Sequence, residues 1–122
     1  MATAADFRRI ALSFPNVDEH EHAGHPAFTV GGRRFAGLAS VAQGYGNLTL
    51  TPEVQAGFVA DAPDIFLPIP GGFGRMGHTH IILAAAGKDT LHDALHTAYK
   101  LRVAQNAATK SRSKSPKARK PR

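Results

Sequence analysis

The chain has 122 residues, a length typical of one domain, and it contains 15 Lys and Arg, 9 Asp and Glu and no cysteine. Without cysteine, the chain has no disulfides, thiolate metal sites, iron–sulfur ligation or cysteine nucleophile. No apolar stretch approaches the roughly 18 residues of a membrane span, and charged residues interrupt the N-terminal apolar pattern where a signal peptide needs an unbroken core. We therefore expect a soluble, cytoplasmic protein that does not bind membranes.

The formal net charge of +6 is concentrated at the C-terminus. The last thirteen residues hold no acid and seven cations, which are Lys110, Arg112, Lys114, Lys117, Arg119, Lys120 and Arg122. The preceding residues carry eight basic and nine acidic side chains, a formal charge of −1. No large apolar residue follows Val103, so this tail buries too little surface to offset the entropy of ordering. We expect a domain at residues 1–107 and a disordered Lys/Arg-rich tail at residues 108–122.

The N-terminus predicts a helix followed by a polar loop. Thr3 and Asp6 form a capping pattern ahead of apolar residues at helical spacing. Pro15 ends that pattern, which places the helix near residues 3–14. The acidic, histidine-bearing residues 18–26 then indicate a loop.

Short β-type runs separated by glycine turns come next. Residues 28–30 and 33–41, joined by Gly31-Gly32, predict a β-hairpin. Residues 43–47 have a turn composition, and the alternation at residues 48–50 predicts a third short strand.

The second half of the chain predicts a helix, an irregular stretch and a strand. Thr51-Pro52-Glu53 supplies a cap, an N1 proline and a first-turn acid, so a helix of about two turns ends near Ala60. An irregular stretch is expected around three prolines, Pro63, Pro68 and Pro70. The β-branched and aliphatic residues 78–84 then predict a strand on which His78 and His80 share a face.

A last helix, capped by Thr90 with Asp93, is predicted to fray by Ala108. Its buried stripe consists of Leu91, Ala94, Leu95, Ala98 and Tyr99. Hairpin strands between helices indicate a two-layer α+β domain, in which helices cover one face of an antiparallel sheet.

The segment Gly72-x-Gly74-x-x-Gly77 has the spacing of a dinucleotide-binding fingerprint. Such a fingerprint needs a strand before it and a helix after it, because the pyrophosphate sits on the helix N-terminus. Here prolines precede the glycines and a β-type segment follows them. The segment therefore indicates a glycine-rich connection into a strand, with Arg75 at its tip available to a phosphate.

Seven histidines occur in three groups whose spacing lets two ligands face the same side. The groups are His20, His22 and His25, then His78 and His80, then His92 and His96. No HExxH pattern is present, and the helical pair lies on the polar face of its helix. We expect adventitious nickel or zinc affinity at most, with no metal site and no cofactor.

The acids lie in the polar loop and at helix starts, and no nucleophile-elbow sequence occurs, so no enzyme is expected.

Four segments follow one another in a distinctive order. They are Pro15 with Asp18-Glu19, HPAFTVGGRRFA at residues 25–36, TPE at residues 51–53 and PGGFGRMG at residues 70–77. With these segments, the sequence resembles the MmcQ/YjbR family over roughly residues 5–100. The resemblance implies a compact α+β fold similar to frataxin and secretion chaperones, and DNA binding through wing-like hairpins without a cofactor. Two departures are His78, where the family commonly has tryptophan, and the basic tail, whose Lys/Ser/Pro/Ala composition resembles linker-histone tails.

The leading hypothesis is a non-enzymatic DNA-binding protein with weak sequence preference. Arg33, Arg34 and Arg75 would contact phosphates from the folded body, and the seven tail cations would supply most of the affinity. The alternative is a small-ligand or protein-binding module that uses the sheet face with His78 and His80, the tail being a solubility or localisation appendage. An enzyme with His25 or His78 as general base ranks third, because no partner residue is evident. No pattern sets the oligomeric state.

Overall fold

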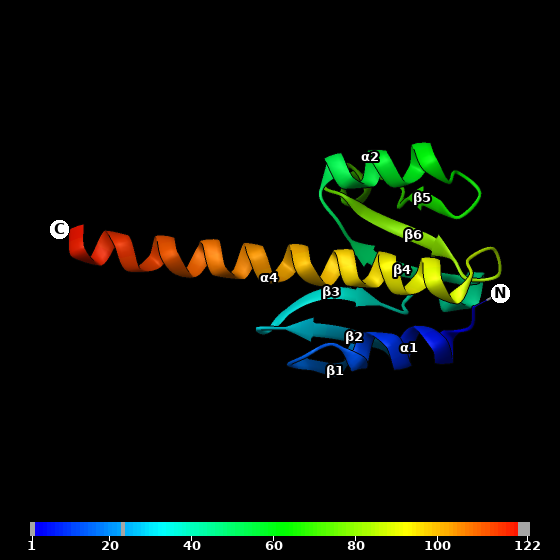
Figure 1. The fold of residues 1–122 in the computed structure, drawn as a ribbon, viewed down its shortest axis with the longest axis horizontal. Helices are drawn as coiled ribbons and strands as arrows, with labels where there is room; N and C mark the ends of the chain where they lie inside the picture. Colours follow the sequence, from blue (N-terminus) through cyan, green and yellow to red (C-terminus); the bar gives the residue numbers. More distant parts are fainter. Residues whose placement is uncertain (1, 23, 120–122) are drawn as a thin grey trace.

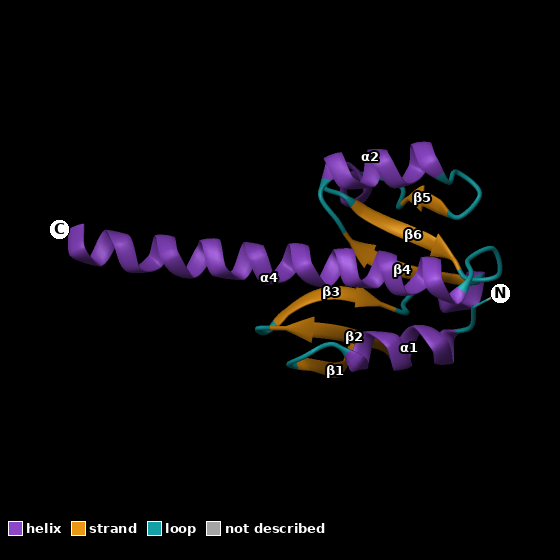
Figure 2. Cartoon of the chain, viewed as in Figure 1, coloured by secondary structure: helices purple, strands orange, loops and turns teal. Residues whose placement is uncertain are grey.

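The structure, a computed structural model, describes the backbone of residues 2–22 and 24–119 and the side chains of residues 2–21 and 24–108. A six-stranded sheet in the order β1-β2-β3-β4-β6-β5 forms its centre, and every neighbouring pair of strands is antiparallel (Figure 1). Figure 2 shows α1 and α4 lying over the sheet, roughly along its strands. The predicted α+β class is therefore confirmed.

Short connections join the helices and strands along the chain. In order they are α1 (Ala4–Ser13), β1 (Val17–His22), β2 (His25–Val30), β3 (Arg33–Gly37), the 3-10 turn η1 (Val41–Gln43), β4 (Tyr45–Thr49), α2 (Pro52–Asp61), β5 (Phe66–Pro68), α3 (Gly72–Arg75), β6 (His78–Ile82) and α4 (Lys88–Arg119).

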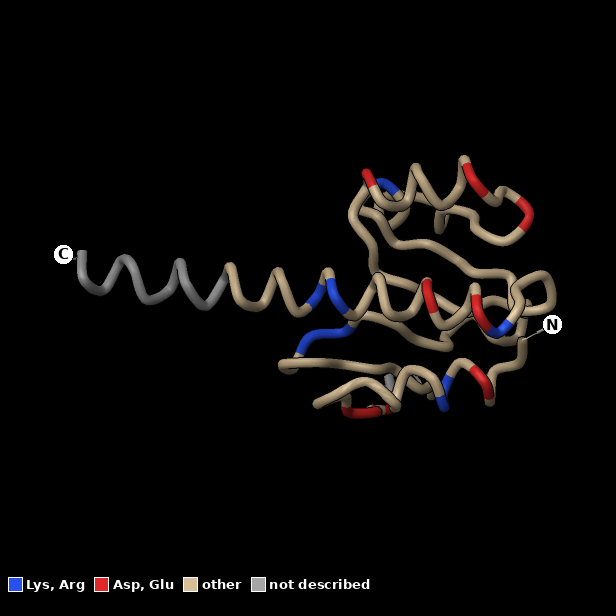
Figure 3. The backbone as a smooth tube through the Cα atoms, in the orientation of Figure 1, with Lys and Arg blue, Asp and Glu red and all other residues tan. Residues whose placement is uncertain are grey.

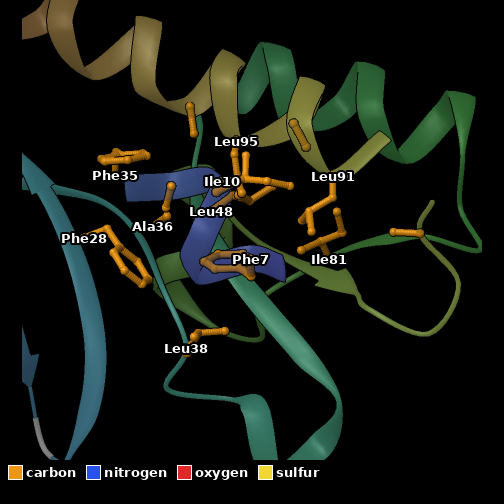
Figure 4. Close-up of a cluster of buried hydrophobic side chains, with 14 of the residues drawn as sticks. Phe7, Ile10, Phe28, Phe35, Ala36, Leu38, Leu48, Ile81, Leu91 and Leu95 are labelled. Carbon is orange, nitrogen blue, oxygen red and sulfur yellow. The ribbon is translucent and has the colours of Figure 1, made fainter. Parts of the chain in front are cut away.

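The hydrophobic core lies between the sheet and the helices α1 and α4 (Figure 4). Its largest fully buried apolar side chains are Phe7, Phe28, Phe35, Leu48, Ile81, Leu91 and Leu95. Each such side chain contributes roughly 1.5–3 kcal/mol through the removal of apolar surface from water. The core thus joins both terminal helices to the middle of the sheet.

Local signals explain the first helix. Thr3 Oγ1 accepts a hydrogen bond from the Asp6 amide at 3.1 Å, and Asp6 Oδ2 accepts one from the Thr3 amide at 3.1 Å. This is the predicted capping box, which satisfies two amides that the helix itself leaves free. Phe7 and Ile10 lie buried on the face toward the sheet, as their spacing predicts.

The prediction of a loop at residues 18–26 is wrong at both ends, because residues 18–22 belong to β1 and residues 25–26 to β2. Residues 17–22 form the edge strand β1, which pairs with β2 in a hairpin from Val17↔Val30 to His22↔His25. Residues 18–21 are all exposed, so no alternation of apolar and polar side chains marks the strand. Charged side chains suit an edge strand, because they oppose pairing with another chain.

The sequence also misplaced several boundaries. The stretch predicted to be irregular contains β5 and α3, and Pro68 ends β5, an edge strand on which a missing amide is tolerated. The third strand begins earlier than predicted, at Tyr45, and β6 ends earlier, at Ile82. α4 begins at Lys88, two residues before the predicted cap Thr90.

Helix α4 runs along the sheet beside β3 and β4 and passes the β2–β3 turn (Figure 1). The Tyr99 hydroxyl donates to the Pro15 carbonyl at 2.8 Å, and Asn106 Nδ2 donates to the Val30 carbonyl at 3.0 Å. The helix extends past Ala108, where the pattern predicts fraying, and ends at Arg119. The tail side chains lie outside the described residues, and the disorder of residues 108–122 stays a prediction.

Helix α2 packs on the same side of the sheet, beside β5. Its Phe58 ring lies 4.8 Å from the ring of Phe66, which pairs in register with the core residue Ile81. Gln55 Nε2 donates to the carbonyls of Gly74 and His78, each at 3.0 Å, and lies 3.2 Å from Thr79 Oγ1. The hydrogen bonds of Gln55 therefore link α2 to α3 and to the start of β6.

A first prediction concerns the close approach of α1 to the sheet at Gly46. A Cβ at this position would lie 2.7 Å from Phe7 Cδ2 and 3.2 Å from Ile81 Cγ2. We expect Gly46→Ala to lower the free energy of unfolding by about 1–3 kcal/mol, because Phe7 has no room to move in the packed core. Urea denaturation measures the effect.

The matched control is Gly57→Ala in α2, where a Cβ would meet no atom within 4 Å. Removing a glycine from a helix interior should raise the free energy of unfolding by about 0.5–1 kcal/mol. Equal stability of the two variants would contradict the packing described here.

A second prediction concerns the side chain of Gln55. Gln55→Ala should lower the free energy of unfolding by about 0.5–1.5 kcal/mol and should speed amide hydrogen exchange in residues 71–79. The control is Gln43→Ala, since Gln43 is exposed and its side chain makes no hydrogen bond to the rest of the described chain. Unchanged exchange in residues 71–79 would show that Gln55 does not hold this segment.

Candidate functional site

Three arginines meet at one end of the sheet, and we call Arg33, Arg34 and Arg102 the arginine edge. β3 starts directly after the β2–β3 turn, so Arg33 and Arg34 occupy its exposed first positions. α4 brings Arg102 near Arg33. Figure 3 shows blue Lys and Arg segments of α4 next to the blue start of β3. Their charges act on neighbouring groups. Burial and then the charge of Arg33 lower the pKa of Arg102. Within the described residues, none of the three makes an ion pair with a carboxylate.

The position of Arg102 follows from the packing of α4. Tyr99, one turn earlier, places its ring 5.7 Å from the buried Phe35 ring, and Asn106, one turn later, bonds the Val30 carbonyl. Residues three or four apart lie on one face of a helix, so Arg102 also faces the sheet. Its Nε atom is buried and finds no hydrogen-bond partner in the described part of the chain. A buried, unsatisfied donor is costly, and an acceptor on a bound anion would remove that cost.

A cavity of about 320 Å³, the open-face pocket, lies on the sheet face away from α1 and α4. Successive residues of β4 point to opposite faces of the sheet. Gly46 and Leu48 therefore face the core, while Asn47 and Thr49 line the pocket. Small residues of β2 and β3, Ala27 and Gly37 among them, leave the space open.

His78 and His80 of β6 both line the open-face pocket. This confirms the prediction that the two side chains share one face of the strand. His80 Nδ1 lies 2.9 Å from Asn47 Oδ1, and the His80 ring packs 4.6 Å from that of Tyr45. Burial lowers the pKa of His80, so its ring is neutral at neutral pH. Because Asn47 Oδ1 can only accept a hydrogen bond, Nδ1 of the neutral His80 ring carries the proton and Nε2 is left as an acceptor.

The neighbouring His78 connects the pocket to the arginine edge. Burial first, and then the charges of Arg34 and Arg102, lower its pKa. Arg34 also lines the pocket, and its Cδ lies 4.0 Å from the position of a Cβ on Gly37. The Arg34 side chain therefore runs back along its own strand toward the pocket.

The glycine motif forms the short helix α3 and the turn into β6. Gly77 has a φ of +106°, and a Cβ there would lie 2.7 Å from the Leu50 carbonyl carbon. Only glycine fits this conformation and this approach, so the motif has a structural role, as the sequence indicates. α3 exposes two large apolar side chains, with Phe73 63% and Met76 66% accessible. The Phe73 ring lines the open-face pocket and lies edge-on to His78 at 5.4 Å.

The structure brings together some of the predicted site residues. Arg33 and Arg34 join the arginine edge, whereas Arg75 folds over its own loop, with one guanidinium nitrogen 3.7 Å from a Cβ position on Gly72. Sequence reasoning missed Arg102, although it lies three residues beyond the buried-stripe residue Tyr99. The seven tail cations, Lys110, Arg112, Lys114, Lys117, Arg119, Lys120 and Arg122, have side chains outside the described residues.

Metal-binding groups do not gather in the described part of the chain. Among residues 2–21 and 24–108, no three His, Asp or Glu side chains lie close enough to hold a metal ion. His92 and His96 pack on Phe14 instead, at ring distances of 5.7 and 5.3 Å. No helix that the structure describes is long and apolar enough to cross a membrane.

Comparison with known proteins gives one family and one structural relative. A crystal structure of the Deinococcus radiodurans protein DR2400, described as a DUF419 domain, is 20% identical to this chain and has a TM-score of 0.67. The match covers 83% of this chain and 78% of that one, and at this identity it shows a shared fold alone. No curated protein matches the chain. The family model described as YjbR matches residues 12–101, most of the sequence, and the chain therefore belongs to the YjbR family.

Proposed function

We propose that this protein binds nucleic acid, most simply DNA, without catalysing a reaction. In this proposal the arginine edge and the basic tail contact phosphates. The observation that carries it is the meeting of three arginines that have no carboxylate partner in the described residues. A surface that keeps like charges together is destabilised unless an anion neutralises them, and nucleic acid supplies a row of phosphates.

The path of the chain supports one continuous basic surface. Asn106 is bonded to Val30, directly before the β2–β3 turn, so the chain leaves the body beside the arginine edge. The seven tail cations follow in sequence from this point. Phosphate contacts from both regions therefore fit along one strand, and such contacts position a protein without reading base sequence.

The non-enzymatic part of the proposal stays a prediction from the sequence, in which no nucleophile-elbow pattern occurs. The alternative, a small-ligand or protein-binding module, is supported by the open-face pocket. Thermal stabilisation by a metabolite, unchanged after removal of the tail, would favour that alternative.

A third prediction concerns the tail. Duplex binding by the full chain should weaken with salt, with a log–log slope of about −5 to −6 if most tail cations contact phosphates. A chain ending at Ala108 should lose most of this slope and most of its affinity at low salt. A loss of less than about threefold on truncation would contradict the counterion argument.

A fourth prediction tests whether the arginine edge itself binds phosphates, as opposed to an effect of the net charge of the protein. Arg33→Gln with Arg34→Gln should reduce the salt slope by about two and should weaken duplex binding at low salt by at least about tenfold. Fluorescence anisotropy across a salt series measures both quantities.

The matched control is Arg8→Gln with Arg9→Gln, which removes the same formal charge. Arg8 already bonds Glu19 at 2.8 Å and Arg9 bonds Asp6 at 3.3 Å, so their charges are locally neutralised. Equal losses in the two double variants would show that only net charge matters, and that the arginine edge is no phosphate site.

A further inference from the structure

We propose that the open-face pocket receives one unstacked base of a single-stranded nucleic acid, with Phe73 stacking on that base and Arg34 holding the neighbouring phosphate. This inference rests on the proposed function and adds the substrate class, single strands in preference to duplex.

The size of the open-face pocket suits this occupant. Its volume of about 320 Å³ lies at the lower end of the roughly 300–1,000 Å³ that ligand pockets span. A base with part of its sugar fits such a space, whereas a dinucleotide cofactor needs more. The pocket opens on a sheet face that neither α1 nor α4 covers, so a strand can lie across its mouth.

Phe73 supplies an aromatic surface at the pocket. Phe73 is 63% exposed although it is large and apolar, and its ring lies edge-on to His78 at 5.4 Å. α3 is itself held by Gln55, which bonds the Gly74 carbonyl. A fixed, exposed aromatic ring beside basic side chains is the usual way in which proteins bind single strands, because every base has a face that stacks.

The polar groups of the pocket match the edge of a base. The fixed His80 ring presents Nε2 as an acceptor, and the Asn47 amide nitrogen is a donor. A base edge carries both donors and acceptors, so it can satisfy both groups at once. Thr49 and Ser40 add hydroxyls on the same lining.

Arg34 joins the pocket to the phosphate-binding surface. It lines the pocket and belongs to the arginine edge, so a phosphate that it contacts is next to a base in the pocket. A base in an intact duplex is paired and stacked and does not reach such a site without costly extrusion. The same geometry therefore favours a single strand.

The experiment compares Phe73→Ala with the unchanged full chain. The probes are a single-stranded oligodeoxynucleotide of about ten nucleotides, its duplex, and the same strand with abasic positions. We expect Phe73→Ala to weaken single-strand binding by about tenfold and duplex binding by less than about twofold. The abasic strand should bind the unchanged protein about as weakly as the intact strand binds the variant.

The control is Met76→Ala, since Met76 is on the same loop, is 66% exposed and does not line the open-face pocket. It should change single-strand binding by less than about twofold. Both side chains are exposed, so neither substitution removes core packing. Hydrogen-exchange protection of Asn47 and His80 by the intact strand, absent with the abasic strand, is the second readout.

Equal effects of the two substitutions, or equal affinity for abasic and intact strands, would overturn the base-in-pocket proposal. If salt-dependent duplex binding persisted in that case, the proposed function would still stand. Binding of free thymidine monophosphate as tight as that of the strand would also overturn it and would assign the pocket to a small ligand. Absence of binding to every nucleic acid at low salt would overturn both proposals.

Discussion

The packing of α4 against the sheet is the contact on which the rest of the molecule depends. Leu91 and Leu95 bury one face of this helix in the core, and the helical repeat then fixes where its later residues lie. Tyr99 reaches Phe35, and Arg102 arrives beside the start of β3. Because the core holds the helix in this rotation, an arginine far along the chain is held next to the hairpin arginines.

The sheet divides the protein into a packed side and an accessible side. Strand alternation sends Leu48 to the core and Asn47 to the opposite face, so one short segment serves both stability and the open-face pocket. The small residues of β2 and β3 keep that face hollow. The glycine motif completes the lining of the open-face pocket, because Gly77 turns the chain into β6 and α3 places Phe73 at the pocket.

Membership of the YjbR family and the likeness to DR2400 establish the fold, and a fold does not by itself determine a function. Function therefore depends on particular side chains. The arginine edge, whose charges pair with no carboxylate of the described residues, favours a polyanion, and the exposed aromatic ring near it favours bases. His78 lies between the two features and contacts Phe73 edge-on.

Short-range patterns in the sequence by themselves determined α1, the β2–β3 hairpin and the buried stripe of α4, because caps, glycine turns and helical periodicity act within a few residues. They also identified Arg33 and Arg34 as exposed cations. They missed β1, whose exposed side chains show no alternation and whose hydrogen bonds come from β2. Only the tertiary structure decided the meeting of Arg102 with the hairpin and the open-face pocket, because both arise from contacts between residues far apart in the chain.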